Sequence, residues 1–78
     1  MNAKELIIYI TQGLVDNHHA VSVNEIKAAQ TTIFELKVAK QDLGKIIGRK
    51  GRTADAMRTI LQSVAAKHER RMSLEIIE

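Results

Sequence analysis

Residues 46–57 read IIGRKGRTADAM, and this segment carries the clearest structural signal in the chain. Its two glycines, Gly48 and Gly51, enclose an arginine and a lysine. Glycine in or beside a helix costs about 1 kcal/mol relative to alanine, so the pair predicts backbone shapes that alanine cannot adopt. The flanking segments, residues 41–46 and 54–69, both read as helical. The stretch therefore predicts two helices joined by a short, charged glycine loop.

The rest of the chain predicts one more helix and three strands. A helix over residues 2–17 has an apolar face at spacings of three and four, formed by Ala3, Leu6, Ile7, Ile10 and Leu14. Residues 21–29 and 31–40 alternate between apolar and polar positions, as strands do. A slip between Val23 and Ile26 predicts a β-bulge or a change of phase in the first of them. Residues 71–78 form the third strand.

The predicted order of elements is α-β-β-α-α-β. The long helix over residues 52–69 carries an apolar stripe, formed by Ala54, Met57, Leu61, Val64 and Ala65, which is expected to face the sheet. A chain of 78 residues has room for one domain. We therefore expect a single domain over residues 1–78, of the two-layer α+β class, with a three-stranded sheet covered by helices on one face.

The positive charge of the chain is concentrated around the glycine loop. Residues 44–58 carry a net charge of +4, from Lys45, Arg49, Lys50, Arg52 and Arg58 against Asp55, so the other residues together carry −1. Local positive charge of this kind indicates a polyanion as partner. No cysteine is present, which excludes disulfides and cysteine-bound metals. No apolar run is long enough to span a membrane, so a cytoplasmic, membrane-free protein is expected.

The glycine loop is well suited to bind phosphate. It directly precedes the long helix, whose first N–H groups lack partners within the helix and attract anions. Arg49 and Lys50 at the loop tip and Arg52 in the first turn add cations. Neither nucleotide-binding pattern, G-x-x-x-x-G-K-[ST] or G-x-G-x-x-G, is present. Several cations in sequence instead match the successive phosphates of a nucleic-acid strand.

The segment LGKIIGRKGRTADAMRTIL, residues 43–61, resembles the signature of the KH domain, and the order of elements resembles the type II KH arrangement. The whole chain is similar to the small single-KH bacterial RNA-binding proteins of the KhpA family. The resemblance implies binding of single-stranded RNA through Gly48, Arg49, Lys50 and Gly51, with Lys45 and Arg52 as further basic contacts. It places Ile46 and Ile47 near the groove that receives the bases.

The family also implies a biological role. Its members are RNA chaperones or post-transcriptional regulators in the cytoplasm of bacteria. They work with a larger KH-containing partner in processes such as cell elongation, and so affect cell shape. We carry these properties over as expectations that rest on the resemblance alone.

No set of residues predicts an enzyme, and no cofactor or metal is expected. His18, His19 and His68 have no carboxylate cluster around them, so they are interpreted as turn residues. Asp42 and Asp55 are each expected near the start of a helix and not as an acid–base pair. The two aromatic residues lie outside the basic segment, which argues against a stacking platform for bases.

Two other functions remain open from the residues alone. Two helices around a glycine turn also fit a helix-turn-helix DNA binder. An assembly module is the second alternative, because one sector of the long helix carries no charge over two turns, namely Ala56, Thr59, Ile60 and Ser63. This sector is the expected interface of a homodimer, or of a heterodimer with the larger partner. The competing interpretation is that Ile60 only widens the core stripe.

Overall fold

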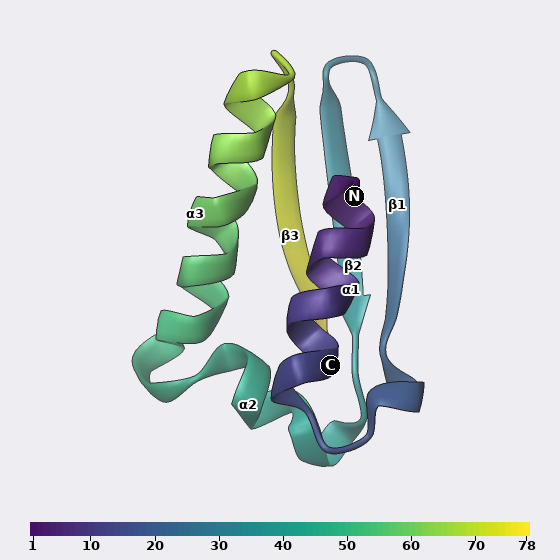
Figure 1. Cartoon of the computed structure of the whole chain (residues 1–78), viewed down its shortest axis with the longest axis vertical. Helices are drawn as coiled ribbons and strands as arrows, with labels where there is room; N and C mark the ends of the chain where they lie inside the picture. Colours follow the sequence, from purple (N-terminus) through teal and green to yellow (C-terminus); the bar gives the residue numbers. More distant parts are fainter.

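The computed structural model describes residues 1–78 and contains three helices and three strands (Figure 1). In chain order these are α1 (Ala3–Leu14), β1 (Ser22–Ala28), β2 (Thr31–Lys37), α2 (Leu43–Ile47), α3 (Arg52–Lys67) and β3 (Arg71–Ile77). Short 3₁₀ turns lie at His18–Ala20, Lys40–Asp42 and Arg49–Gly51. The predicted order and the α+β class are confirmed.

The sheet is mixed, with the strand order β1-β2-β3. The β1–β2 hairpin is antiparallel, whereas β2 and β3 run parallel and are connected through α2 and α3. Pairing between β1 and β2 is continuous, from Ser22 opposite Lys37 to Ala28 opposite Thr31. Of the two expected alternatives, the bulge is therefore absent and the change of phase is present. Ile26 breaks the apolar alternation because it lies on the open face of the sheet, where it is 40% exposed.

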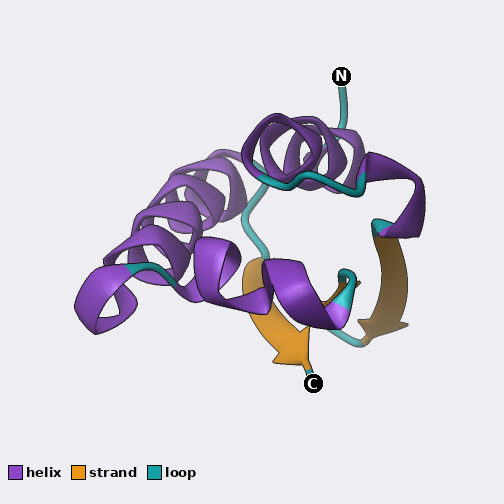
Figure 2. Cartoon of the chain, turned by 90° about the horizontal axis from the view of Figure 1, so that it is seen from below, coloured by secondary structure: helices purple, strands orange, loops and turns teal.

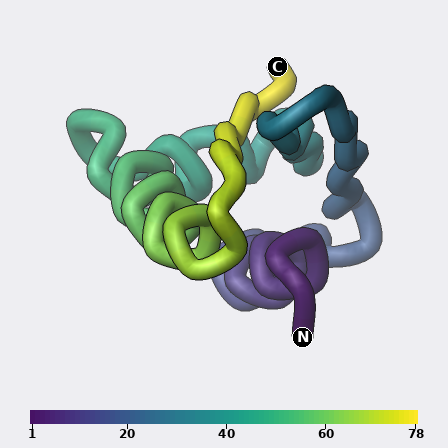
Figure 3. Tube along the Cα trace, turned by 90° about the horizontal axis from the view of Figure 1, so that it is seen from above, coloured from purple at the N-terminus to yellow at the C-terminus, as the bar shows by residue number.

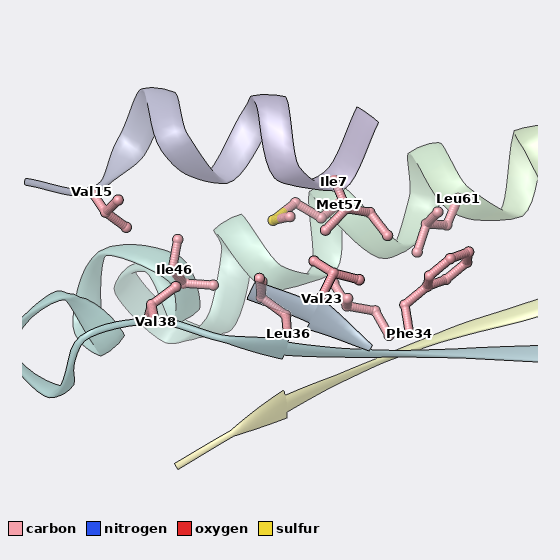
Figure 4. Packing of buried hydrophobic residues seen from close by; sticks show 10 residues of the cluster. Ile7, Val15, Val23, Phe34, Leu36, Val38, Ile46, Met57 and Leu61 are labelled. Carbon is pink, nitrogen blue, oxygen red and sulfur yellow. The ribbon is translucent and has the colours of Figure 1, made fainter. Parts of the chain in front are cut away.

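The helices cover one face of the sheet, as predicted, and the core lies between the two layers (Figure 3). Phe34, Leu36 and Leu74 are the sheet residues at its centre. Figure 4 shows Phe34 and Leu36 facing the buried side chains from the helices and from the segment after α1, namely Ile7, Val15, Ile46, Met57 and Leu61. These contacts fix α2 and the start of α3 relative to the sheet.

Two details of the predicted apolar faces are corrected. Leu14 is 41% exposed, and the following residue, Val15, is buried in its place. The helix ends at Leu14, so the extended backbone at Val15 turns that side chain into the core. In α3, Val64 is only half-buried, whereas the other members of its predicted stripe are buried. None of the helices has the length and apolar run needed to cross a membrane.

Candidate nucleic-acid interface

Figure 2 shows the short turn that joins α2 to α3. The backbone of this turn requires glycine. Gly48 ends α2 with φ 77° and ψ 173°, a conformation available almost only to glycine. Lys50 and Gly51 follow in the left-handed region, with φ of 57° and 74°. A hydrogen bond from the Gly51 N–H to the Gly48 carbonyl, 3.2 Å long, closes the turn.

Gly48 is also required because of its close contact with Thr53. A β-carbon at Gly48 would lie 2.7 Å from the Thr53 β-carbon and 2.9 Å from the Thr53 backbone nitrogen. Real β-carbons do not approach other atoms so closely, and the backbone atom cannot move aside. Gly51, in contrast, has open space where its side chain would be. The two glycines therefore have different roles: Gly48 allows the loop to pack against α3, and Gly51 allows only the turn.

The first turn of α3 is open to an anion. No side chain caps it, because the residue at the capping position is Gly51. Arg49, Lys50 and Arg52 are all exposed around this turn, and none of them forms an ion pair within the chain. Although the Arg52 N–H donates to the Arg49 carbonyl, the positive end of the helix dipole and the three cations together form one site of positive potential.

Lys45 differs from these three cations because it is already paired. Its ammonium group contacts Asp16 in the loop after α1, and it lies 3.3 Å from Asp42 Oδ1. The hydrogen bond to Asp16, followed by that to Asp42, raises the pKa of Lys45 above its ordinary value. Lys45 thus connects α2 to the preceding part of the chain.

Asp42 is the buried centre of this connection. Its carboxylate accepts hydrogen bonds from the backbone N–H of Asn17, at 3.0 Å, and of Asp16, at 3.2 Å. The Asn17 bond lowers the pKa of Asp42, burial opposes the shift, and the Asp16 bond and Lys45 lower it further. The prediction that Asp42 lies at a helix start is correct, but the side chain does not cap that helix. It fastens the loop after α1 to α2.

The two isoleucines before the loop have different surroundings. Ile46 is fully buried in the core, so it has no surface to offer a base. Ile47 is half-buried and lies at the surface beside Gly48. Ile46 supports the loop from inside, and the placement of both residues near the groove that receives the bases stays a prediction.

A second feature of the surface is a hollow of about 210 Å³ that lies between α3 and the edge strand β3. Arg58 lines it and donates from Nε and Nη2 to the Leu74 carbonyl, each at 3.3 Å, while Nη1 contacts Asp55 at 3.4 Å. Arg58 is six residues into α3, about 9 Å along the helix from Arg52. The sequence indicated Arg58 only as part of the basic segment, not as a link between α3 and β3.

The residues considered for metal binding or catalysis do not come together. The rings of His18 and His19 are 4.6 Å apart, but no group of three or more potential metal ligands is present. Asp55 pairs with Arg58 and lies in the first turn of α3, far in the chain from the buried Asp42.

Three features together define a type II KH domain. They are the mixed three-stranded sheet, the order α-β-β-α-α-β, and the G-x-x-G loop between two helices, which carries two basic residues. The family model described as KhpA/KhpB, KH domain matches residues 4–76. The chain therefore belongs to the KhpA/KhpB KH-domain family. This family and the one-turn length of α2 exclude the helix-turn-helix alternative.

Curated relatives are similar over nearly their whole length. RNA-binding protein KhpA of Chlamydia pneumoniae is 51% identical over 75 residues, which cover 96% of both chains. The protein of the same name from Caldanaerobacter subterraneus is 51% identical, covering 94% of this chain and 97% of the relative. RNA-binding protein KhpA of Borreliella burgdorferi is 49% identical, covering 99% of this chain and 94% of the relative. These relatives are named as RNA-binding proteins and not as enzymes. No solved structure is significantly similar to the chain.

Proposed function

We propose that this protein binds single-stranded RNA, with its whole length acting as one KH domain. The observation that carries the proposal is the uncapped first turn of α3 surrounded by Arg49, Lys50 and Arg52, all exposed and unpaired. The relatives named as RNA-binding proteins support RNA as the polyanion. A KH domain holds about four nucleotides of backbone at its glycine loop.

In this proposal the phosphate backbone of the RNA makes the main contact, and its bases make an additional one. The phosphates of the RNA contact the three cations at the uncapped N-terminus of α3, which position the RNA without reading its sequence. The bases then lie against Ile47 and toward the hollow between α3 and β3, where Arg58 and the edge of β3 offer polar contacts. Lys45 acts indirectly in this scheme, because its charge is satisfied by Asp16 and Asp42.

The test is RNA affinity after charge reversal at the loop tip. Replacing Arg49 and Lys50 together with Asp should abolish binding of a labelled single-stranded RNA, measured by fluorescence anisotropy. Both residues are exposed, so the free energy of unfolding should change by less than about 0.5 kcal/mol per site. The matched control reverses Lys67 and Arg71, two exposed residues near the opposite end of α3. Equal affinity in the two double variants would overturn the site assignment.

We also propose that the protein associates through the uncharged sector of α3. Ile60 is 42% exposed, so it does not widen the core. The hydroxyls of Thr59 and Ser63 donate to backbone carbonyls one turn earlier, at 3.0 and 3.3 Å, and so present little polarity to a partner. A second copy, or the larger KH-containing partner that the family implies, would cover this surface. A role as RNA chaperone or regulator would depend on that assembly.

A further inference from the structure

A large hollow lies at the end of the molecule opposite the glycine loop. Figure 1 shows that α1 begins well short of the β1–β2 turn and of the C-terminal end of α3. Between the start of α1, the end of α3 and the adjoining half of the sheet there is a hollow of about 800 Å³. Small-molecule pockets usually have volumes of about 300–1,000 Å³. The size alone therefore permits a ligand.

The rim of this hollow is positively charged. Lys4 from α1, Lys27 from β1 and Arg70 before β3 all line it, together with His68. Glu25 is the only carboxylate in the lining, and its carboxylate lies 3.7 Å from the ammonium group of Lys27, whose side chain is mostly exposed. Lys4 forms no ion pair, so positive charge exceeds negative charge at the rim.

Arg70 is held in place by its backbone and its side chain. The end of α3 forms a Schellman motif, in which the Arg70 N–H bonds to the Ala65 carbonyl at 3.0 Å and Glu69 takes φ 54°. The guanidinium donates from Nε to the buried Thr32 hydroxyl, at 3.2 Å, and from Nη2 to the Thr31 carbonyl, at 3.4 Å. Its Nη1 has no partner in the chain, so the oriented guanidinium retains donors for a ligand.

The inner surface of the hollow is apolar. It is lined by Leu6 from α1, Val64 from α3, Phe34 from the central strand β2 and Met72 from the edge strand β3. An apolar lining with a few oriented polar groups is the usual composition of a small-molecule site. It favours a ligand that has an anionic group for the rim and a flat or apolar body for the interior.

We propose that this hollow binds a small organic anion with an aromatic or apolar body, such as a mononucleotide. The anionic group lies among Arg70, Lys4 and Lys27, and the body lies against the half-buried side chains of Val64 and Met72. The site is separate from the glycine loop, since α3 runs its full length between them, and the proposal does not depend on RNA binding.

The first test uses the fluorescent probe anilinonaphthalene sulfonate, which has both features. The protein should bind it saturably at one molecule per chain, and adenosine monophosphate should displace it while adenosine does not. Lys4→Glu should weaken binding about tenfold, the effect expected when one charge-assisted contact is lost. Lys37→Glu, on the open face of the sheet, is the matched control and should bind like the wild type. Absence of saturable binding, or equal loss in both variants, would overturn the proposal.

A second test fills the hollow. Val64→Phe should remove probe binding, because the larger side chain would occupy the interior of the hollow. An amide NMR spectrum of the wild type should show probe-induced shifts at Lys27, Thr32 and Arg70. Shifts at Arg49 and Lys50 alone would also overturn the proposal. The double Asp variant at the loop tip should still bind the probe, so loss of RNA binding and loss of this site can be distinguished.

Discussion

The side chain of Thr53 occupies the space into which a β-carbon on Gly48 would extend, with the Thr53 backbone nitrogen 2.9 Å from that position. The residue that ends α2 and the residue in the first turn of α3 are thus packed directly against each other. This contact sets where the loop tip lies relative to the N–H groups of α3. Any side chain at Gly48 must therefore displace the loop.

Alanine at Gly48 should consequently be much more harmful than alanine at Gly51. Gly48→Ala combines the steric clash with a backbone that costs about 1–3 kcal/mol for other residues, and RNA affinity should be lost. Gly51→Ala meets no atom and should cost about 1–2 kcal/mol for its left-handed backbone. Urea denaturation and RNA anisotropy of both variants measure the difference. Equal effects of the two substitutions would show that the Thr53 contact does not determine the loop position.

The salt dependence of RNA binding should reflect phosphate contacts from three cations, with no fourth contact from Lys45. With Arg49, Lys50 and Arg52 neutralising three phosphates, the slope of log affinity against log salt should be about −2. A fourfold rise in salt would then weaken binding about 20-fold. Lys50→Ala should reduce the size of the slope by about 0.7, whereas Lys45→Ala should leave it unchanged because Lys45 is paired. A slope that responds to Lys45→Ala would make Lys45 a direct phosphate contact.

The sequence predicts the order of elements and the glycine loop because both depend on local signals. The apolar periods of α3 and β2 are each carried by neighbouring residues, and glycine spacing marks the loop directly. Their agreement with the structure shows that local preferences and the overall fold coincide here.

The parts that could not be predicted depend on contacts between distant residues. Asp42 receives its hydrogen bonds from positions 25 and 26 residues earlier, so no local pattern indicates its role. Ile46 and Ile47 are identical residues, and only the packing of α2 decides which of them is buried. The partnership of Arg58 with Leu74 likewise requires that α3 lie beside the edge of β3. A local charge count could indicate where positive charge gathers, but not which cations are already paired.

Acid should weaken the protein through Asp42. Its pKa in the folded state is lowered, chiefly by the Asn17 N–H, below the unfolded value of about 3.9. The carboxylate therefore stabilises the fold above that pH, and this contribution is lost as the pH falls through the folded pKa. Asp42→Asn should lower the melting temperature at neutral pH and flatten its decline in acid. Asp55→Asn, at an exposed position, serves as the control and should change neither.

Replacing Thr11 with valine should stabilise the protein. Thr11 is fully buried, and its hydroxyl has no hydrogen-bond partner. Valine keeps the shape and removes the unsatisfied group, which should add about 1 kcal/mol to the free energy of unfolding. For a domain of this size the melting temperature should rise by about 4–8 °C. Thr11→Ala removes a methyl group as well and should be less stable than Thr11→Val. A valine variant that melts below the wild type would mean that the hydroxyl is satisfied.

Replacing Ile60 with a charged residue should prevent the proposed self-association through α3 and leave the protein monomeric. Ile60 is the one large apolar side chain in the uncharged sector of α3, with Ala56, Thr59 and Ser63 as small neighbours that allow another helix to approach closely. A chain of this size buries little apolar surface on its own, so covering Ile60 on a partner is favourable. Ile60→Asp should give a folded monomer in sedimentation at tens of micromolar. Gln62→Asp, on the other side of α3, should sediment like the wild type. A wild-type protein that is already monomeric at this concentration would rule out self-association through α3.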